Sequence, residues 1–453
     1  MATENVLESL KTRRMSPMQY VTVIVGLALV VLDGYDIAIT SFASPFIAAG
    51  LHINPTRLGL VGSGALVGLF IGTVVIAPFG DKIGRRNTAI FGAVLVAAGM
   101  GISTYASTFG LLAFGRLVAG AGIGTLIASV AVIFSEFVSS KAYAVVMALY
   151  AAAIPLGTLI GSQWIGPVVA KHGWHVAFGL GTVAALACIP LTVFLLPESL
   201  AYLAISRKAD ALKRFNKTLR RVGIAPVPEL PRAENLIPVK TPVTVVLKGS
   251  LLRSTVLSTV GYFLFMLAFY FATNWAPNYM AAVTHNPLTA PHLMTWYSVG
   301  GIIGVALFAV LAQRINLALA TAVLLVASAV LLGVFGHAAT VQVTPYLAIA
   351  ALSFFLSAAT GGFYSIVPRL YPEKARSTGY GLVIGIGRVG GIVAPTLGGY
   401  FFTDKVDPQL TFWVFAIPLV LSAVVVLALR ADKRSPAGDE AAVTAPAVAT
   451  TQG

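Results

Sequence analysis

Long apolar runs, separated by short polar or charged segments, follow one another along the chain. Each run holds about 20 apolar residues, the length that an α-helix needs to cross the hydrocarbon core of a bilayer. We place twelve such helices at residues 18–46, 56–79, 87–107, 109–135, 142–169, 175–196, 253–281, 291–312, 316–336, 344–369, 377–402 and 409–430. The pattern predicts an all-α integral membrane protein with twelve transmembrane helices.

A polar interval after the sixth run divides the chain into two six-helix halves. We therefore expect a cytoplasmic N-terminus at 1–17, a first half at 18–196, a cytoplasmic linker at 197–252, a second half at 253–430 and a disordered tail at 431–453. A weak internal repeat, in which Lys82-Ile83 aligns with Arg314-Ile315, relates the halves. Parallel repeats of this kind are typical of transporters that bind their substrate near the midplane, between two halves.

Composition supports the membrane class. The chain is 57% hydrophobic and 10% charged, whereas a soluble domain carries about 25% charged residues. A membrane-embedded enzyme would need a nucleophile and base or a metal cluster, and no intramembrane His, Cys–His pair or Glu-rich group appears in the sequence. We therefore expect no enzymatic activity, no metal and no cofactor.

The distribution of basic residues predicts the topology. Of the 30 Lys and Arg residues, only Arg57, Lys171 and Lys405 fall in outer loops when the N-terminus is placed inside. Cytoplasmic loops carry the excess of Lys and Arg in membrane proteins, so both termini are expected to be cytoplasmic. The net charge of +14 is explained by this topology, and we expect the basic linker to lie at the membrane surface and not to bind nucleic acid.

Four charged residues fall deep inside predicted helices, away from the helix ends: Asp33, Asp36, Arg116 and Arg388. Asp33 and Asp36 share one face of the first helix, and a central Asp costs roughly 2.5–3.5 kcal/mol in a bilayer. Counting helical rise places Arg116, which enters from the outside, at a depth similar to that of the two acids, and Arg388 close to the midplane. Arg388 has no acid beside it in sequence, so it either pairs with an acid of the other half or binds an anionic substrate.

The first inner loop reads APFGDKIGRRNTA, from Ala77 to Ala89. Asp81, Arg85 and Arg86 could clamp one helix end to its neighbour, and Glu136 is the expected partner of Arg85. This loop, with FGRLVAGAGIG from Phe114 and PESLAYL from Pro197, resembles the signatures of the major facilitator superfamily over residues 18–430. The resemblance implies the major facilitator fold, with Asp81, Arg85, Arg86 and Glu136 as an inner gate. The loop copy in the second half, LAQRINLA from Leu311, has Gln313 in place of the acid and lacks counterparts of Arg85 and Arg86.

A narrower resemblance rests on Asp33-Gly34-Tyr35-Asp36, NWAPNYM from Asn274 and GIGRVGGIVAP from Gly385. These motifs look like the aromatic acid:proton symporters, a family of the bacterial inner membrane. The resemblance implies import of a benzoate-like or hydroxybenzoate-like anion with protons, and a monomeric state. It assigns proton coupling to Asp33 and Asp36, and we favour Asp33, the deeper one.

An aromatic carboxylate needs a cation and aromatic walls. We expect Arg388 and Arg116 to bind the carboxylate, and we select Tyr150 and Phe355 as wall residues because both lie within a few turns of the midplane. Two alternatives remain open at this stage. One is a proton-coupled carrier of another organic anion, and the other is a drug:proton antiporter. The glycines and prolines of the fifth helix partly resemble an antiporter signature.

Overall fold

A computed structural model of the chain describes residues 5–206, 209–231, 242–312, 314–339, 344–403 and 406–431, and all regular elements in these ranges are helical. The described part leaves out residues 207–208 and 232–241 of the predicted linker and 432–453 of the predicted tail.

The helical elements, including short π and 3-10 segments labelled η, have the following bounds: α1 Asn5–Thr12, α2 Pro17–Phe42, α3 Ser44–Leu51, α4 Pro55–Ile71, η1 Gly72–Ile76, η2 Ala77–Phe79, α5 Gly80–Ile83, α6 Arg85–Thr104, α7 Phe109–Phe137, α8 Ser140–Ile160, η3 Gly161–Ile165, α9 Gly166–His172, α10 His175–Leu195, α11 Leu200–Ile205, α12 Ala211–Arg221, α13 Val243–Val246, α14 Gly249–Val283, α15 Thr289–Leu311, α16 Leu317–Ala338, α17 Thr344–Ile366, η5 Val367–Leu370, α18 Arg376–Gly387, α19 Val389–Thr403 and α20 Pro408–Ala431.

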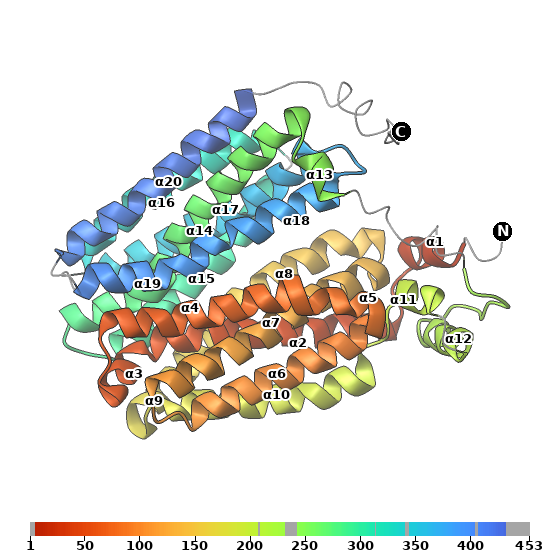
Figure 1. Ribbon diagram of the computed structural model, residues 1–453, viewed down its shortest axis with the longest axis horizontal. Helices are drawn as coiled ribbons and strands as arrows, with labels where there is room; N and C mark the ends of the chain where they lie inside the picture. Colours follow the sequence, from red (N-terminus) through yellow and green to blue (C-terminus); the bar gives the residue numbers. More distant parts are fainter. Residues whose placement is uncertain are drawn as a thin grey trace, which may run out of the picture.

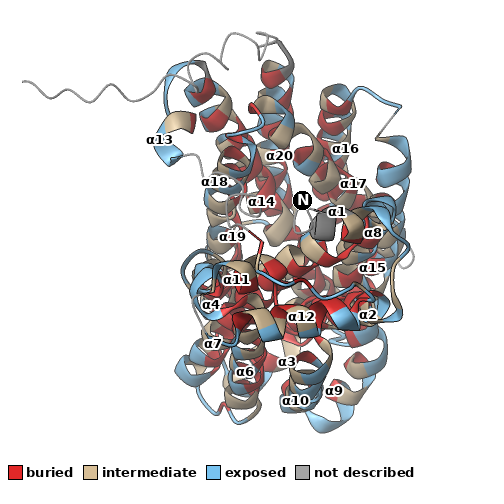
Figure 2. Ribbon diagram, turned by 90° about the vertical axis from the view of Figure 1, so that its right-hand side faces the viewer, coloured by how far each residue is buried: buried red, intermediate tan, exposed pale blue. Residues whose placement is uncertain are grey.

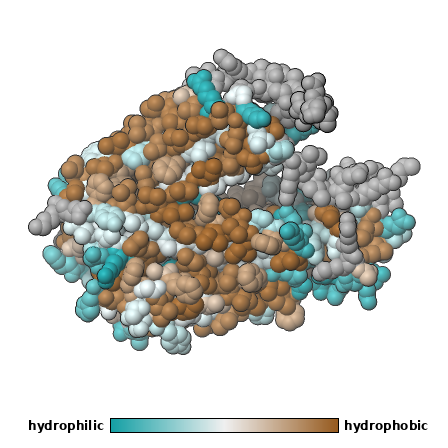
Figure 3. Space-filling view, in the orientation of Figure 1, coloured by the Kyte–Doolittle hydropathy of each residue, from teal (hydrophilic) through white to brown (hydrophobic). Residues whose placement is uncertain are grey.

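Twelve spans in the described residues are long and apolar enough to cross a membrane. The predicted all-α architecture and the number of spans are therefore confirmed. Large apolar side chains such as Ile24, Phe194 and Val310 are exposed on the outer faces of the bundle. Figure 3 shows the resulting apolar surface, and Figure 2 shows that buried positions gather inside the two groups of helices. The exposed apolar side chains suit contact with lipid.

Prolines account for the main departures from the predicted helix bounds. The first span was expected to run to residue 46, but α2 ends at Phe42 and a separate helix, α3, begins with Pro45 in its first turn. In the second and fifth spans, a π-helical segment ends two residues before Pro78 and Pro167, respectively. Proline lacks the N–H that would continue the helical hydrogen-bond ladder, so the backbone changes pitch around it.

The two groups of six spans meet at one end and diverge at the other (Figure 1). We call the end that bears α3 the distal end, and the end that bears α1, α5 and α11–α13 the terminal end. Towards the distal end the hydroxyl of Ser63 on α4 donates to the backbone oxygen of Ile392 (2.6 Å) and bonds Thr396 (2.8 Å) on α19. Ser162 bonds Thr295 across the halves at 3.1 Å. At the terminal end the surface is hollowed between the halves (Figure 3), so the structure has a cleft that opens on that side.

Candidate functional site

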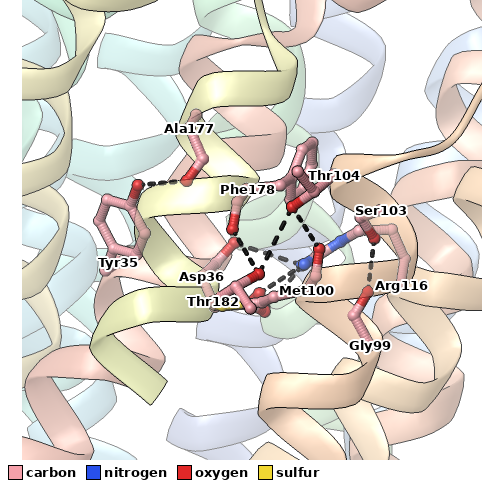
Figure 4. Close-up of polar contacts among 10 residues, drawn as sticks. All are labelled: Tyr35, Asp36, Gly99, Met100, Ser103, Thr104, Arg116, Ala177, Phe178 and Thr182. Carbon is pink, nitrogen blue, oxygen red and sulfur yellow. Dashed lines mark hydrogen bonds and ion pairs between the residues drawn. The ribbon is translucent and has the colours of Figure 1, made fainter. Parts of the chain in front are cut away.

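The guanidinium of Arg116 on α7 forms a buried ion pair with Asp36 on α2. Its two terminal nitrogens each donate to one carboxylate oxygen, the Nη2–Oδ2 distance being 2.7 Å, and Nη2 also donates to the Asp36 backbone oxygen at 3.2 Å. The ring of Phe178 lies under the guanidinium, 5.7 Å from Cζ to the centroid. Figure 4 shows the pair in these surroundings. Both side chains are almost fully buried, at 1% and 2% exposure, so Arg116 is already neutralised.

Asp33 lies one turn before Asp36 and is also buried, with 2% of the residue exposed. Neither of its carboxylate oxygens has a hydrogen-bond partner in the described residues. Depth counting had placed Arg116 within reach of both acids, and the structure pairs it with Asp36. A buried carboxylate without partners is costly when ionised, which sets Asp33 apart from its neighbour.

Close packing of α2 on α8 fixes the face on which these acids lie. A Cβ atom on Gly34 would come within 1.9 Å of the Ile154 backbone oxygen, and one on Gly157 within 2.0 Å of the Val31 oxygen. The Thr158 hydroxyl also donates to the Gly34 oxygen at 3.0 Å. Because the backbones touch on this side, Asp33 and Asp36 are held toward the interior of the bundle.

Arg388 is the second arginine inside the bundle and lies at the junction of α18 and α19. Its guanidinium hydrogen-bonds Tyr364 on α17, and Arg388 is half-buried. In the described part of the chain no carboxylate lies within 4.0 Å of it, since the ion pairs found there are Arg85–Asp81 and Arg116–Asp36. The charged group of the other half that interacts with it electrostatically is Asp33. Asp33 of the first half therefore lies within electrostatic range of Arg388 of the second half, and no hydrogen bond or ion pair joins the two in the described residues.

Tyrosines surround Arg388. Five of them interact electrostatically with its guanidinium, and they come from α8, α14, α17 and α18: Tyr150, Tyr262, Tyr270, Tyr364 and Tyr380. Tyr364 is 40% exposed, so the cluster is open to the cleft. Tyr150 thus lies where the sequence placed an aromatic wall, whereas the ring of Phe355 packs edge-on against Phe354, with centroids 5.1 Å apart. Sequence reasoning missed Tyr380, which precedes Arg388 by about two helical turns and lies within electrostatic range of its guanidinium.

A small cavity of about 30 Å³ lies between the Asp36–Arg116 pair and α14. Thr40 and Arg116 line it from the first half, Tyr270 and Asn274 from the second. The Thr40 hydroxyl and Arg116 Nε have no hydrogen-bond partner in the described residues. The volume suits one or two water molecules, which these polar groups would bond. It is too small for a molecule much larger than water, whereas the cleft between the halves is open to solvent (Figure 3).

The inner-loop residues meet at the terminal end of the first half. Arg85 pairs with Asp81 and also donates to the Ala77 backbone oxygen at 3.1 Å. Glu136 was expected to pair directly with Arg85. It instead accepts hydrogen bonds from the Ser199 hydroxyl (2.7 Å) and the Leu200 N–H (2.9 Å) at the start of α11, with Arg85 as an electrostatic neighbour. Neutral donors at a helix N-terminus satisfy the Glu136 carboxylate, so that expectation was wrong.

The acid that meets the loop is Glu198, which sequence reasoning did not select although it lies in the PESLAYL motif. Its Oε1 accepts from the backbone N–H groups of Arg86 and Ser199, both at 3.0 Å. Gly84 has a φ of +102°, and a Cβ there would come within 2.3 Å of Glu198 Oε2. Burial raises the pKa of the Glu198 carboxyl above its usual value, and the backbone hydrogen bonds counteract this only in part.

The sequence and the structure were compared with those of known proteins. The model of the family described as Major Facilitator Superfamily matches residues 26–341 and 258–451. The benzoate transport protein of Acinetobacter baylyi is 25% identical over 95% of this chain and 93% of its own length. The 4-hydroxybenzoate transporter PcaK of the same organism is 25% identical over 91% of each chain. The gallate transporter of Pseudomonas putida is 23% identical over 94% of each chain.

A solved structure of similar fold is the proton:xylose symporter XylE bound to 6-bromo-6-deoxy-D-glucose. It aligns with a TM-score of 0.69 and 16% identity, over 91% of this chain and 95% of the other. The similarity extends over both groups of six spans. The fold is therefore that of these transporters, as the sequence resemblance implied.

Proposed function

The chain belongs to the major facilitator superfamily, and from this premise we propose that it imports an aromatic carboxylate of the benzoate or hydroxybenzoate class together with protons. The relatives that match nearly its whole length are named for benzoate, 4-hydroxybenzoate and gallate transport. The observation that carries the proposal is Arg388, which lies half-buried among tyrosines with no carboxylate at ion-pair distance in the described residues.

Arg388 binds the substrate carboxylate in this proposal. Its planar guanidinium matches a carboxylate with two parallel hydrogen bonds, and the surrounding aromatic side chains suit an aromatic ring. Arg116 was the other expected ligand of the carboxylate. Because Asp36 already occupies its guanidinium, Arg116 and Asp36 act by fixing α2 against α7.

Asp33 carries the coupling proton. Its carboxylate is buried without hydrogen-bond partners in the described residues, and it lies within electrostatic range of Arg388 of the opposite half. A substrate carboxylate bound to Arg388 would neutralise the cation that otherwise stabilises ionised Asp33. Uptake of a proton by Asp33 then accompanies substrate binding, so the two ions move together.

Transport follows from alternating access. In this structure the cleft opens at the terminal end, and the halves close on each other through α4 and α19 at the distal end. The reverse arrangement would open Arg388 to the distal side. Asp81, Arg85, Arg86 and Glu136, together with Glu198, tie the terminal end of the first half into one unit and act as the inner gate.

We place the protein in the bacterial inner membrane as a multi-pass monomer with both termini in the cytoplasm. The basic loop residues Lys82, Arg85 and Arg86 and the basic helix α12 support this orientation, because they lie at the terminal end. Positively charged loops favour the cytoplasmic side. The cleft of the present structure then opens inward, where an imported substrate leaves.

Uptake into proteoliposomes tests the proposal. Purified full-length protein is reconstituted, and entry of radiolabelled 4-hydroxybenzoate or benzoate is followed under a verified pH gradient, acidic outside. The expected result is accumulation above equilibrium that a protonophore abolishes. Absence of accumulation of both acids would contradict the proposal. Accumulation only of other organic anions, or gradient-driven efflux of a drug, would favour the two alternative transporter classes.

A further inference from the structure

The tyrosine hydroxyls around Arg388 have unused hydrogen-bonding capacity. The Tyr364 hydroxyl bonds Arg388 and lies 3.5 Å from the Tyr262 hydroxyl. The Tyr150 hydroxyl makes one long bond, 3.4 Å, to the Ile127 backbone oxygen. No hydrogen bond is made by the Tyr380 hydroxyl within the part of the chain that the structure describes. A site meant for a purely apolar ring would need none of these groups.

These tyrosines lie on both walls of the cleft. Tyr364 and Tyr380 belong to the second half, and their rings meet edge-on with centroids 6.1 Å apart. Tyr150 on α8 faces them from the first half and interacts with both. The three phenol groups therefore come from both halves and lie within electrostatic range of one another, and alternating access would bring the two halves together around them.

The tyrosines also have an order along the cleft. Tyr380 precedes Arg388 by eight residues, which corresponds to about 12 Å along a helix. Tyr380 interacts with Tyr143 on α8, and the Lys11 ammonium of α1 lies 5.8 Å from the Tyr143 ring. Since α1 lies at the terminal end, Tyr380 is nearer the mouth of the cleft and Arg388 is deeper. An aryl acid with its carboxylate on Arg388 and its ring extended toward the mouth of the cleft would bring its ring substituents toward Tyr380.

We propose that Tyr150, Tyr364 and Tyr380 form a subsite that hydrogen-bonds a polar ring substituent, so that the transported acid is a hydroxylated aromatic carboxylate rather than an unsubstituted one. This inference rests on the proposed function, because it assumes that Arg388 binds the carboxylate.

The physical reason is the removal of water when the cleft closes. A buried hydroxyl without a partner is unfavourable. An unsubstituted ring would leave Tyr380 and Tyr150 without hydrogen-bond partners in the closed state, whereas a ring hydroxyl would donate to one of them and accept from another. Sites built to hydrogen-bond a substrate hydroxyl discriminate strongly against the analogue that lacks it.

A different role for these hydroxyls would be to solvate Arg388 alone. Removal of one hydroxyl would then weaken the binding of every carboxylate to a similar degree. A subsite for ring substituents predicts a selective effect, so the ratio of two affinities separates the two roles.

The test is isothermal titration calorimetry of the purified full-length protein with 4-hydroxybenzoate and with benzoate. We expect the wild type to prefer 4-hydroxybenzoate by about tenfold or more. In Tyr380→Phe the affinity for 4-hydroxybenzoate should fall by about three- to tenfold, as for the loss of one hydrogen bond, while the affinity for benzoate changes less than about twofold. Tyr150→Phe is the second variant, with the same expected selectivity.

Tyr105→Phe is the matched control, because Tyr105 is 83% exposed at the end of α6, and both affinities should stay at wild-type values. Three results would overturn the inference and leave the proposed function standing. The first is an equal loss of affinity for both acids in Tyr380→Phe and Tyr150→Phe, and the second is unchanged affinities in both variants. The third is a wild type that binds the two acids with equal affinity. Binding of neither acid by the wild type would contradict the proposed function itself.

Discussion

Arg116 and Asp36 join α7 to α2 through two parallel hydrogen bonds between buried charges. Both side chains are at most 2% exposed, so each charge depends on the other for its stability. The neighbouring acid, Asp33, has no such partner in the described residues. The two aspartates of one helical turn therefore have different physical roles.

Removal of one member of the Arg116–Asp36 pair should destabilise the fold strongly. Arg116→Met leaves a buried carboxylate, and Asp36→Leu leaves a buried guanidinium, at a cost of about 3–5 kcal/mol each. The double variant, which removes both charges, should be more stable than either single variant. Thermal unfolding of the detergent-solubilised protein measures this, and a double variant with a melting temperature below both single variants would contradict the account.

Asp33→Asn should separate binding from coupling. The variant has no carboxylate to protonate, so gradient-driven accumulation should disappear while exchange of labelled for unlabelled 4-hydroxybenzoate continues. Asp210→Asn serves as the control, since Asp210 is exposed before α12 and its side chain makes no cap hydrogen bond. Full proton-driven accumulation by Asp33→Asn would remove Asp33 from the coupling role.

Residue depth along a helix could be predicted from the sequence, whereas rotation about the helix axis could not. Counting helical rise brought Asp33, Asp36 and Arg116 to similar depth. Which acid Arg116 meets depends on how α2 is turned, and the backbone contact of Gly34 with Ile154 decides that. Apolar helices present many plausible interior faces, so the sequence pattern alone leaves this choice open.

The charged residues at the terminal end of the first half show the same limit. Asp81, Arg85, Arg86 and Glu136 could be found as charges at predicted helix ends. The hydrogen-bond partners of the acids at this end were harder to predict, because Glu198 accepts from backbone N–H groups and not from a side chain of opposite charge. Backbone donors carry no sequence signature, so an acid that they bind resembles any other acid in a loop.

Glu198 should make stability depend on pH. Its folded-state pKa is raised by burial, so the folded protein binds this proton more tightly than the unfolded chain does. The associated stability is fully present below the ordinary pKa of Glu, about 4.3, and is lost as pH rises through the raised folded value. Glu198→Gln cannot ionise and should lack this loss. Melting temperatures measured from pH 4 upward should therefore show wild type falling relative to the variant, and parallel curves would contradict the raised pKa.

Closure of the distal end should depend on Gly59. A Cβ there would lie 2.2 Å from the Pro395 backbone oxygen on α19, so Gly59→Val should force α4 and α19 apart and favour opening at the distal end. Spin labels attached at Tyr105→Cys after α6 and Leu410→Cys in α20 measure the distance between the two halves by double electron–electron resonance. Cys188→Ser removes the one natural cysteine so that only these two positions are labelled. Gly110→Val is the control, because no atom lies within 4 Å of a Cβ at that position. A distance distribution in Gly59→Val identical to that of the control would contradict this role.

The most direct test of the carboxylate site compares 4-hydroxybenzoate with its methyl ester, which has the same ring but no charge. Wild type should bind the acid at least about tenfold more tightly than the ester, as a charge-assisted hydrogen bond requires. Arg388→Gln should abolish that preference, and Arg388→Lys should weaken binding of the acid. Arg376→Gln, an exposed arginine at the start of α18, should behave as wild type. An Arg388→Gln variant that still prefers the acid as strongly as wild type would contradict the claim that Arg388 holds the substrate carboxylate.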